Sequence, residues 1–221
     1  MKYIRYYASV VSVLLLLSLL IFTSCSEDGS DDGYDNSIST PTGTHNDKGY
    51  VDLGLSVKWA TCNVGANSPE EYGDYFAWGE TEPKDVYSSN TYKWGEITEI
   101  GNILYLKYNR TDNNLVLELE DDAASVNWGG NWRMPTAQEI RELQNNCTIE
   151  TVVQNGVEGI IVTGKNGNSI FIPGIGFTYW SNQRYTNKPE GAYWFSPQRN
   201  WISDFNYGDR KYGKSIRPVC P

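Results

Sequence analysis

The stretch "NWRMPTAQEIRELQNNC", Asn131–Cys147, carries the clearest local structural signal in the chain. Thr136 followed three residues later by Glu139 is a capping box, in which each side chain accepts a hydrogen bond from the other residue's backbone N–H. Pro135 favours an extended residue before it, so a helix is expected to begin just after it. Arg133 is expected to pair with a carboxylate within the fold. We therefore interpret the stretch as architecture, with structural roles for Trp132, Arg133, Pro135, Thr136 and Glu139.

The helix predicted after Pro135 has an apolar face. Ile140 and Leu143 are three residues apart and lie on one side of a helix, which indicates that this side faces the core. Glu139 is accounted for as a cap, so no catalytic acid is assigned to it.

Strand patterns flank this helix in the sequence. In "VDLGLSVKWATCNVG" the apolar residues Leu53, Leu55, Val57 and Trp59 alternate with other residues, which predicts a half-buried strand. "GIIVTGKNGNSIFIPG", Gly159–Gly174, predicts a hairpin, with Asn166-Gly167 as the two positive-φ residues of a type I′ turn.

A second short helix is predicted from Leu117, in "LELEDDAASVNWGG", with its acidic residues in the first turn, where they suit the helix dipole. The same carboxylates offer oxygen ligands of the kind that calcium prefers. We favour the solvated helix start over a calcium site, and assign no metal and no cofactor. The residues concerned are Glu118, Glu120, Asp121 and Asp122.

The N-terminal 24 residues predict a secretory signal. Lys2 and Arg5 precede an apolar run from Val10 to Phe22, which is short for a membrane span. "FTSC" resembles the lipobox of bacterial lipoproteins, which predicts lipidation of Cys25. Residues 25–48 are rich in Ser, Gly, Asp and Asn and predict a flexible acidic tether.

These features predict an outer-membrane lipoprotein. The acidic cluster after Cys25 resembles the signal that exports some lipoproteins to the cell surface, and we favour that location over the periplasmic face. Residues 49–221 are long enough for one domain with a real core. The formal charge is −9 for the whole chain, and loss of Lys2 and Arg5 makes it −9 − 2 = −11. So acidic a chain lacks the basic surface of a nucleic-acid-binding protein.

With Cys25 lipidated, three cysteines remain in the domain. Three thiols in an oxidising compartment suggest one disulfide and one free thiol. We favour a Cys62–Cys220 disulfide, which would join the two ends of the domain. The single histidine, His45, falls in the predicted tether, so triads and metal sites that need an imidazole are excluded from the domain.

The C-terminal part is unusually aromatic. Between Phe177 and Tyr212, rings alternate with Asn, Gln, Ser and Arg. Rings give rigid contact area at low entropy cost, and polar neighbours orient a ligand, although many of the rings are also expected to fill the core. The residues predicted to bind a ligand are Trp180, Asn182, Arg184, Tyr193, Trp194, Arg199, Trp201 and Tyr207.

Seven short motifs in this order resemble the major paralogous (FISUMP) domain of bacterial lipoproteins, across nearly all of Gly49–Pro221. They are "YVDLGLSVKWATCNVGA", "GDYFAWGET", "WRMPTAQEIREL", "VTGKNGNSIFIPG", "YWS", "AYWF" and "GKSIRPV".

The resemblance implies an α+β, C-type-lectin-like fold with two short helices, small twisted antiparallel sheets and long irregular loops. It also implies adjacent first and last strands, which would bring Cys62 near Cys220. The calcium-binding tripeptides of C-type lectins are absent from the sequence, as is the cysteine pair of formylglycine-generating enzymes, which share this fold. Neither activity is therefore carried over.

The function expected from the sequence is a non-catalytic surface module that binds a glycan, a peptide or a protein. One alternative is a structural or fimbrial accessory lipoprotein whose rings bury against other subunits. Another is a glycoside hydrolase that uses paired carboxylates, for which Glu80, Glu82 and Asp85 are the candidates.

Overall fold

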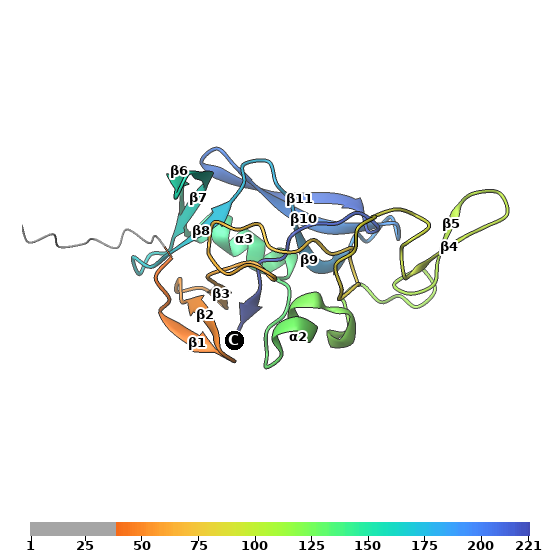
Figure 1. The fold of residues 1–221 in the computed structure, drawn as a ribbon, viewed down its shortest axis with the longest axis horizontal. Coiled ribbons are helices and arrows are strands. Elements are labelled where there is room, and N and C mark those ends of the chain that lie inside the picture. The colour runs from red at the N-terminus through yellow and green to blue at the C-terminus, as the bar shows by residue number, and fades with distance from the viewer. Residues whose placement is uncertain (1–38) are drawn as a thin grey trace, which may run out of the picture. The chain divides into compact units, whose positions relative to one another are not determined.

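The computed structural model describes residues 39–221, apart from the side chain of Phe205. The predicted signal peptide, Cys25 and the first part of the predicted tether lie outside the described residues. The described part is rich in β-structure and contains two α-helices, in agreement with a small α+β domain (Figure 1).

The first sheet joins both ends of the described chain. Its strands are β1 (Gly43–His45), β2 (Lys48–Val51), β3 (Lys58–Ala60) and β12 (Val219–Cys220), in the order β1-β2-β3-β12. All neighbours are antiparallel, and Val219 pairs with Trp59. The early and final strands are therefore adjacent, as expected.

The fold begins earlier than residue 49, because β1 lies within the predicted tether. The carbonyl of His45 accepts from Trp132 Nε1 (2.8 Å), and Nε2 of His45 accepts from the backbone N–H of Asn131 (3.1 Å). The rings of His45 and Trp132 are 5.7 Å apart, edge to face. The domain therefore contains its imidazole after all, and the exclusion based on His45 lying outside the fold was wrong in its premise. These two hydrogen bonds of His45 hold the loop before Arg133.

The strand predicted across Leu53–Trp59 forms only at its end. Gly54 has a φ of +73° and its N–H donates to Asp52 Oδ1 (2.8 Å), so the chain turns here instead of extending. Leu53 and Trp59 are nevertheless buried. The apolar alternation was thus correct about burial and wrong about the backbone.

The second sheet is a three-stranded meander of β6 (Thr148–Gln154), β7 (Val157–Thr163) and β8 (Ser169–Pro173). The predicted β7–β8 hairpin is confirmed, but its type I′ turn is not. Thr163 pairs with Ser169, which leaves five loop residues, and Gly167 alone of Asn166-Gly167 has a positive φ. The two-residue turn with two positive φ angles is instead Asn155-Gly156, between β6 and β7.

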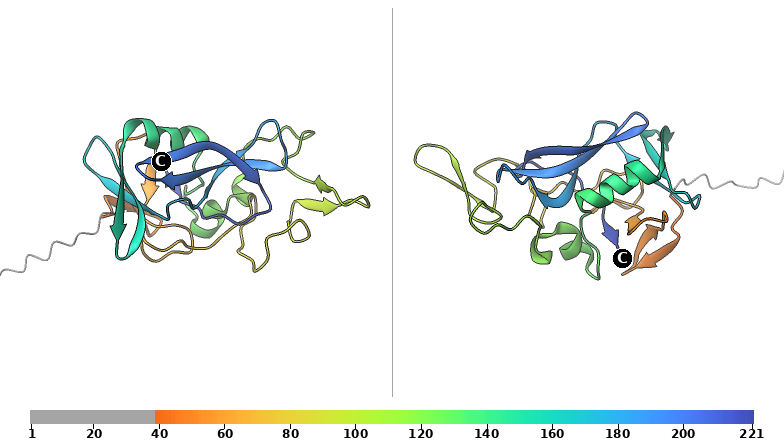
Figure 2. Two further views of the ribbon diagram at one scale, coloured as in Figure 1. Left: turned by 90° about the horizontal axis from the view of Figure 1, so that it is seen from above. Right: turned by 180° about the vertical axis from the view of Figure 1, so that it is seen from behind.

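The third sheet carries the aromatic C-terminal region. It has the order β11-β10-β9, with β9 at Tyr179–Arg184, β10 at Gly191–Gln198 and β11 at Trp201–Asp209. Helix α3 (Ala137–Asn146) packs across this sheet (Figure 2). A separate hairpin of β4 (Gly95–Ile97) and β5 (Ile103–Tyr105) projects from the rest of the domain (Figures 1 and 2).

The predicted capping box of α3 is present. Glu139 N donates to Thr136 Oγ1 (3.2 Å), and Thr136 N donates to Glu139 Oε2 (2.8 Å). Arg133 binds both carboxylate oxygens of Glu139, at 2.5 and 2.9 Å, which confirms its predicted ion pair. Ile140 and Leu143 are buried. Burial by itself would raise the pKa of Glu139, but hydrogen bonds from Arg133 and Thr136 outweigh it and lower the pKa.

The helix predicted from Leu117 is divided in two. A 3₁₀ turn, η1 (Leu119–Asp121), is followed by α2 (Ala123–Trp128). The acidic residues precede α2 instead of forming its first turn, because Asp122 is its N-cap and accepts from Ser125 N (3.1 Å). The same carboxylate accepts from Met134 N (2.9 Å), so it joins α2 to the strand-like segment before α3.

The predicted Cys62–Cys220 disulfide is not formed; both residues are free thiols, as is Cys147. The register explains this. Cys220 pairs with Lys58, whereas the chain around Cys62 runs beside Ile216, whose carbonyl accepts from Val64 N (3.0 Å). At about 3.3 Å per residue, the cysteines are on the order of 10 Å apart along the strands, beyond the reach of about 7 Å.

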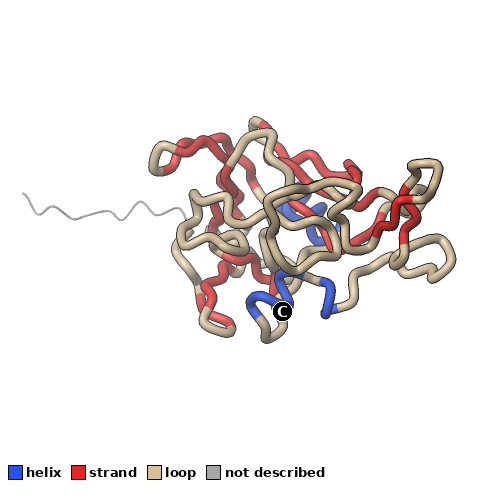
Figure 3. The backbone as a smooth tube through the Cα atoms, turned by 45° about the vertical axis from the view of Figure 1, so that its right-hand side comes forward, coloured by secondary structure: helices blue, strands red, loops and turns tan. Residues whose placement is uncertain are grey.

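Buried arginine hydrogen bonds connect the same chain ends. Arg217 is fully buried, and its guanidinium donates to Asn63 Oδ1 (2.7 Å) and to the carbonyls of Ala60 (3.0 Å) and Thr61 (2.7 Å). The segment from residue 61 to residue 94 forms no regular strand or helix and runs as a loop over the core (Figure 3). Its buried rings, including Phe76 and Trp78, fix this loop.

Candidate functional site

Three of the predicted ligand-binding residues lie in the interior, which corrects the prediction. Trp180 is fully buried and donates from Nε1 to the carbonyl of Phe76 (2.8 Å). Asn182 and Arg184 are 5% and 3% exposed. The loops that flank β9 cover its outer edge, through bridges to Val116 and Ser215, so these side chains are enclosed. They hold the fold together and cannot meet a ligand.

Two further predicted residues are exposed but lie far from Tyr193 and Tyr207. Trp201 is 49% exposed, and Arg199 pairs with Glu158 (Nη2 to Oε1, 3.0 Å); both lie at the turn between β10 and β11. Tyr193 pairs with Tyr207 near the other end of the same hairpin. Gln198 at the turn is five positions along the strand from Tyr193, which is about 15–20 Å. The predicted set therefore does not form one site.

Three tyrosines gather at that far end of the third sheet. The register of Tyr193 with Tyr207 places both side chains on one side of the sheet. Tyr185, just after β9, stacks on Tyr207 with centroids 4.0 Å apart and an 11° angle between planes. Its ring also meets Tyr193 edge to face at 5.2 Å. We call Tyr185, Tyr193 and Tyr207 the tyrosine face.

Helix α3 begins beside this end of the sheet, where Ala137 and Ile140 line a small cavity together with Tyr193. The N–H of Ala137, at the start of α3, donates to Gln183 Oε1 (2.9 Å), and the helix packs its buried residues with Phe195 and Ile202. Tyr207 is 40% exposed. Lys188 donates from Nζ to the hydroxyl of Tyr207 (3.0 Å). The face therefore presents aromatic carbon with a phenol, an ammonium and an amide at its rim.

A glycine makes the tyrosine stack possible. A Cβ on Gly191 would lie 3.0 Å from Cδ2 of Tyr207 and 3.5 Å from Cβ of Tyr185. Arg110 donates to the carbonyl of Asn187 (3.2 Å) and so braces the loop that carries Tyr185 and Lys188. Tyr185 was not among the predicted ligand-binding residues, although it belongs to the aromatic C-terminal region.

Trp194 belongs to a different environment. It packs against the cluster that contains Trp180, and Lys214 Nζ lies 4.8 Å from the Trp180 ring centre and 5.1 Å from that of Trp194. Burial lowers the pKa of Lys214 to about 8, although Asp209 opposes it. Among residues 39–221, the buried indole N–H of Trp194 has no hydrogen-bond partner. Trp194 thus contributes to packing more than to an open surface.

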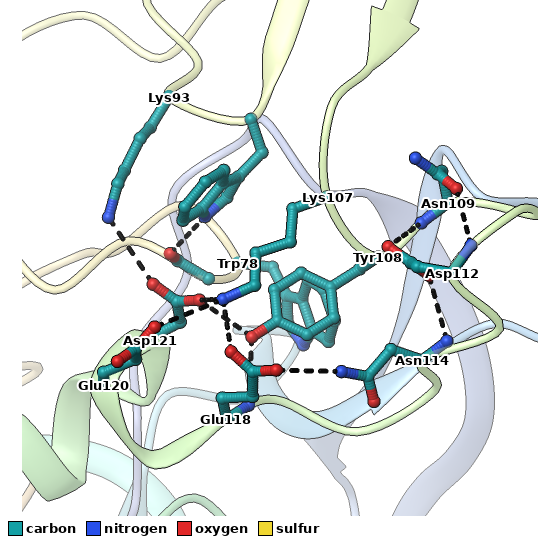
Figure 4. A network of polar contacts seen from close by, with 12 residues as sticks. Trp78, Lys93, Lys107, Tyr108, Asn109, Asp112, Asn114, Glu118, Glu120 and Asp121 are labelled. Carbon is teal, nitrogen blue, oxygen red and sulfur yellow. Dashed lines mark hydrogen bonds and ion pairs between the residues drawn. The ribbon is translucent and has the colours of Figure 1, made fainter.

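The acidic run considered for calcium surrounds a lysine. Oxygens of Glu118, Glu120 and Asp121 lie within 4.8 Å of one another. Lys107 Nζ points into this group, 2.6 Å from Asp121 Oδ2 and 3.4 Å from Glu120 Oε1, and also contacts Glu118 (Figure 4). Tyr108 donates its hydroxyl to Asp121 Oδ2 (2.8 Å).

An ammonium therefore sits where a metal cation would bind. Burial by itself would lower the pKa of Lys107, but its hydrogen bonds to Asp121 and Glu118 raise the pKa, so it stays charged. Asp122, the fourth residue of the run, turns inward to Met134. As arranged, Lys107 offsets part of the negative charge of the three carboxylates and joins its loop to η1.

Of the three carboxylates considered for glycoside hydrolysis, Glu80 has structural contacts. Glu80 is buried; its Oε1 accepts from Lys93 N (2.7 Å), and its Oε2 pairs with Lys84 Nζ (2.6 Å). Glu82 and Asp85 are exposed on the same loop. Glu80 is thereby explained as the residue that holds this loop to the segment before β4.

Residues 39–221 contain no helix long and apolar enough to cross a membrane. Comparisons of the chain with family models, with curated proteins and with solved structures gave no match.

Proposed function

We propose that the chain is a non-catalytic binding module that recognises a glycan through the tyrosine face. The observation that carries this proposal is the clustering of Tyr185, Tyr193 and Tyr207 at one end of the sheet, where Tyr207 is 40% exposed. Sugar rings present patches of C–H that pack on aromatic carbon, and their hydroxyls bind the polar groups at its rim. Lys188 and Gln183 supply those polar groups here.

The wider setting of the proposal is a surface lipoprotein with a C-type-lectin-like FISUMP domain. Two helices, small antiparallel sheets and the pairing of β3 with β12 are in keeping with that fold. Lipidation of Cys25 would anchor the chain in the outer membrane, and the residues between Cys25 and β1 would serve as a tether. Replacing Cys25 by serine should move the protein from the membrane fraction to the soluble fraction, and retention in the membrane would contradict the anchor.

The glycan proposal is tested on an array of polysaccharide fragments with the wild-type chain and the Tyr207→Ala variant. We expect the variant to lose at least tenfold in affinity for any glycan that binds, because its ring is the most accessible of the three. Tyr212→Ala is the matched control, since Tyr212 is 50% exposed but lies outside the tyrosine face. Equal binding by all three proteins would refute the assignment.

A second candidate, a structural accessory that assembles with other subunits, is favoured by the β4–β5 hairpin. Ile100 at its tip is 83% exposed, and Leu104 and Ile97 are 54% and 40% exposed. Exposed apolar groups on a projecting hairpin are typical of a protein contact. Sedimentation of the wild type beside an Ile100→Ser, Leu104→Ser double variant tests this candidate. A monomer in both cases, at high protein concentration, would count against self-assembly.

A further inference from the structure

A cavity of about 310 Å³ lies at the C-terminal end of α3. It is bounded by the loop at Leu53–Ser56, by Glu142 and Asn146 of the helix, and by Lys165 in the β7–β8 turn. A water molecule takes about 30 Å³ of liquid, so the cavity has room for a ligand of amino-acid size. It lies at the opposite end of the ten-residue helix from the tyrosine face, about 15 Å along its axis.

Hydrogen bonds fix the walls of this cavity. Ser56 donates to Glu142 Oε2 from both its N–H (3.0 Å) and its hydroxyl (2.6 Å), which ties the loop to α3. On the other side, the side-chain amides of Asn166 and Asn168 each donate to the carbonyl of Asp52 (2.8 Å).

The β7–β8 turn also approaches the loop closely at Gly164, where a Cβ would be 2.2 Å from the Leu53 carbonyl oxygen. Three segments far apart in sequence are thus held together before any ligand arrives. Such a preformed cavity lowers the entropy cost of binding.

The cavity carries opposite charges on its two sides. Glu142 uses Oε2 for Ser56, which leaves Oε1 available as far as the contacts of the described residues go. The last turn of α3 contains no basic residue, so the partial negative charge of the helix C-terminus adds to that of Glu142. Lys165 faces them from the turn and, within residues 39–221, makes no ion pair.

We propose that this cavity binds a small zwitterion, an ammonium and a carboxylate on one amino-acid-sized skeleton. Its ammonium binds Glu142 Oε1 at the end of the helix, and its carboxylate binds Lys165. Leu55 offers apolar contact to a side chain, and the amide of Asn146 offers a further hydrogen bond. A free amino acid and the backbone of a short peptide share this chemistry.

The first test is calorimetric titration of the full chain with L-leucine and with glycyl-L-leucine, which distinguishes the free amino acid from the peptide. Leucinamide lacks the carboxylate and N-acetyl-leucine lacks the ammonium, so each should bind at least tenfold more weakly than L-leucine or the dipeptide. Absence of heat with both L-leucine and the dipeptide at millimolar concentration would overturn the proposal, as would equal affinity for the blocked compounds.

Charge variants assign the two ends of the ligand. Lys165→Gln should weaken whichever zwitterion binds at least tenfold and leave leucinamide unchanged. Glu142→Gln should weaken the zwitterion similarly and leave N-acetyl-leucine unchanged. Glu158→Gln, at an exposed carboxylate away from the cavity, is the control and should bind as wild type. The opposite pattern, or no effect of either cavity variant, would refute the arrangement.

A cavity-filling variant tests the location without removing a charge. Asn146 is exposed at the end of α3, so Asn146→Trp should fill the space and abolish zwitterion binding while the melting temperature stays near that of wild type. Retained binding would place the ligand elsewhere. Tyr207→Ala should leave zwitterion binding unchanged, which separates this proposal from the glycan proposal.

Discussion

Replacing Asp122 by asparagine is expected to change how the stability of the domain depends on pH. The carboxylate is buried, and burial raises its pKa to about 6 although Met134 N and Ser125 N donate to it. The usual value is 3.8, so the pKa rises by about 6 − 3.8 ≈ 2 units. At about 1.4 kcal/mol per unit, ionisation costs the folded state about 3 kcal/mol relative to the unfolded chain.

The sign follows from where the proton binds more tightly. The folded protein holds the Asp122 proton up to about pH 6, whereas the unfolded chain loses it near pH 4. The stability that this proton contributes is complete below about pH 4 and is lost as the pH rises through 6. Asparagine does not titrate, and its side-chain oxygen can still accept from Ser125 N. The free energy of unfolding of the variant relative to wild type should therefore rise by about 3 kcal/mol between pH 4 and pH 7.

Urea unfolding of the full chain, followed by tryptophan fluorescence at pH 4, 5, 6 and 7, measures this difference. Asp112→Asn is a matched control, because Asp112 is exposed and backbone hydrogen bonds from Asn114 and Asn109 outweigh burial and lower its pKa. Its difference from wild type should stay nearly constant from pH 4 to pH 7, because a carboxyl with a lowered pKa titrates mostly below pH 4. If the Asp122→Asn difference stayed flat from pH 4 to 7, the burial argument would be wrong.

Three further predictions follow from contacts in the described residues. Glu139→Gln should lower the free energy of unfolding by about 1–3 kcal/mol at pH 7, because it breaks the ion pair with Arg133. This difference from wild type should become smaller below about pH 4, because the pKa of Glu139 is lowered in the folded protein. Urea unfolding at both pH values measures the difference. Gly156→Ala should cost about 1–2 kcal/mol, since Gly156 has a φ of +81°, and a Gly101→Ala variant with similar geometry should cost a comparable amount in thermal melts. Alkylation of the unreduced protein in denaturant should modify Cys62, Cys147 and Cys220. In the native protein, Cys147 should react slowly at pH 8, because burial raises its pKa to about 11. If Cys62 and Cys220 were protected from alkylation in denaturant, the two residues would form a disulfide, contrary to the structure.

The local features of the domain could be predicted from the sequence, because they depend on residues close together in the chain. The Thr136–Glu139 capping box needs one helical turn, and Arg133 is six residues from Glu139, with which it forms an ion pair. The inward face of α3 follows from helical spacing alone. The β7–β8 hairpin was likewise visible in its apolar strands.

The features that decide the site depend on contacts between distant segments. Asn-Gly occurs twice, but only the register of β6 with β7 leaves a two-residue loop, so only Asn155-Gly156 forms the tight turn. The sequence predicted that Trp180 would bind a ligand at the surface. In the structure, the loops at Phe76 and Val116 enclose β9, so Trp180 is buried.

Composition determined that rings and carboxylates would be abundant, and tertiary structure decided which of them meet water. Lys107 contacts Asp121, fourteen residues away in the sequence, and Tyr185 stacks on Tyr207 across the intervening strand β10. The physical reason is that burial and strand register are properties of the packed chain. Residue type sets only the free-energy cost of burying or exposing a side chain, and the sum of many contacts between distant segments selects which side chains are buried.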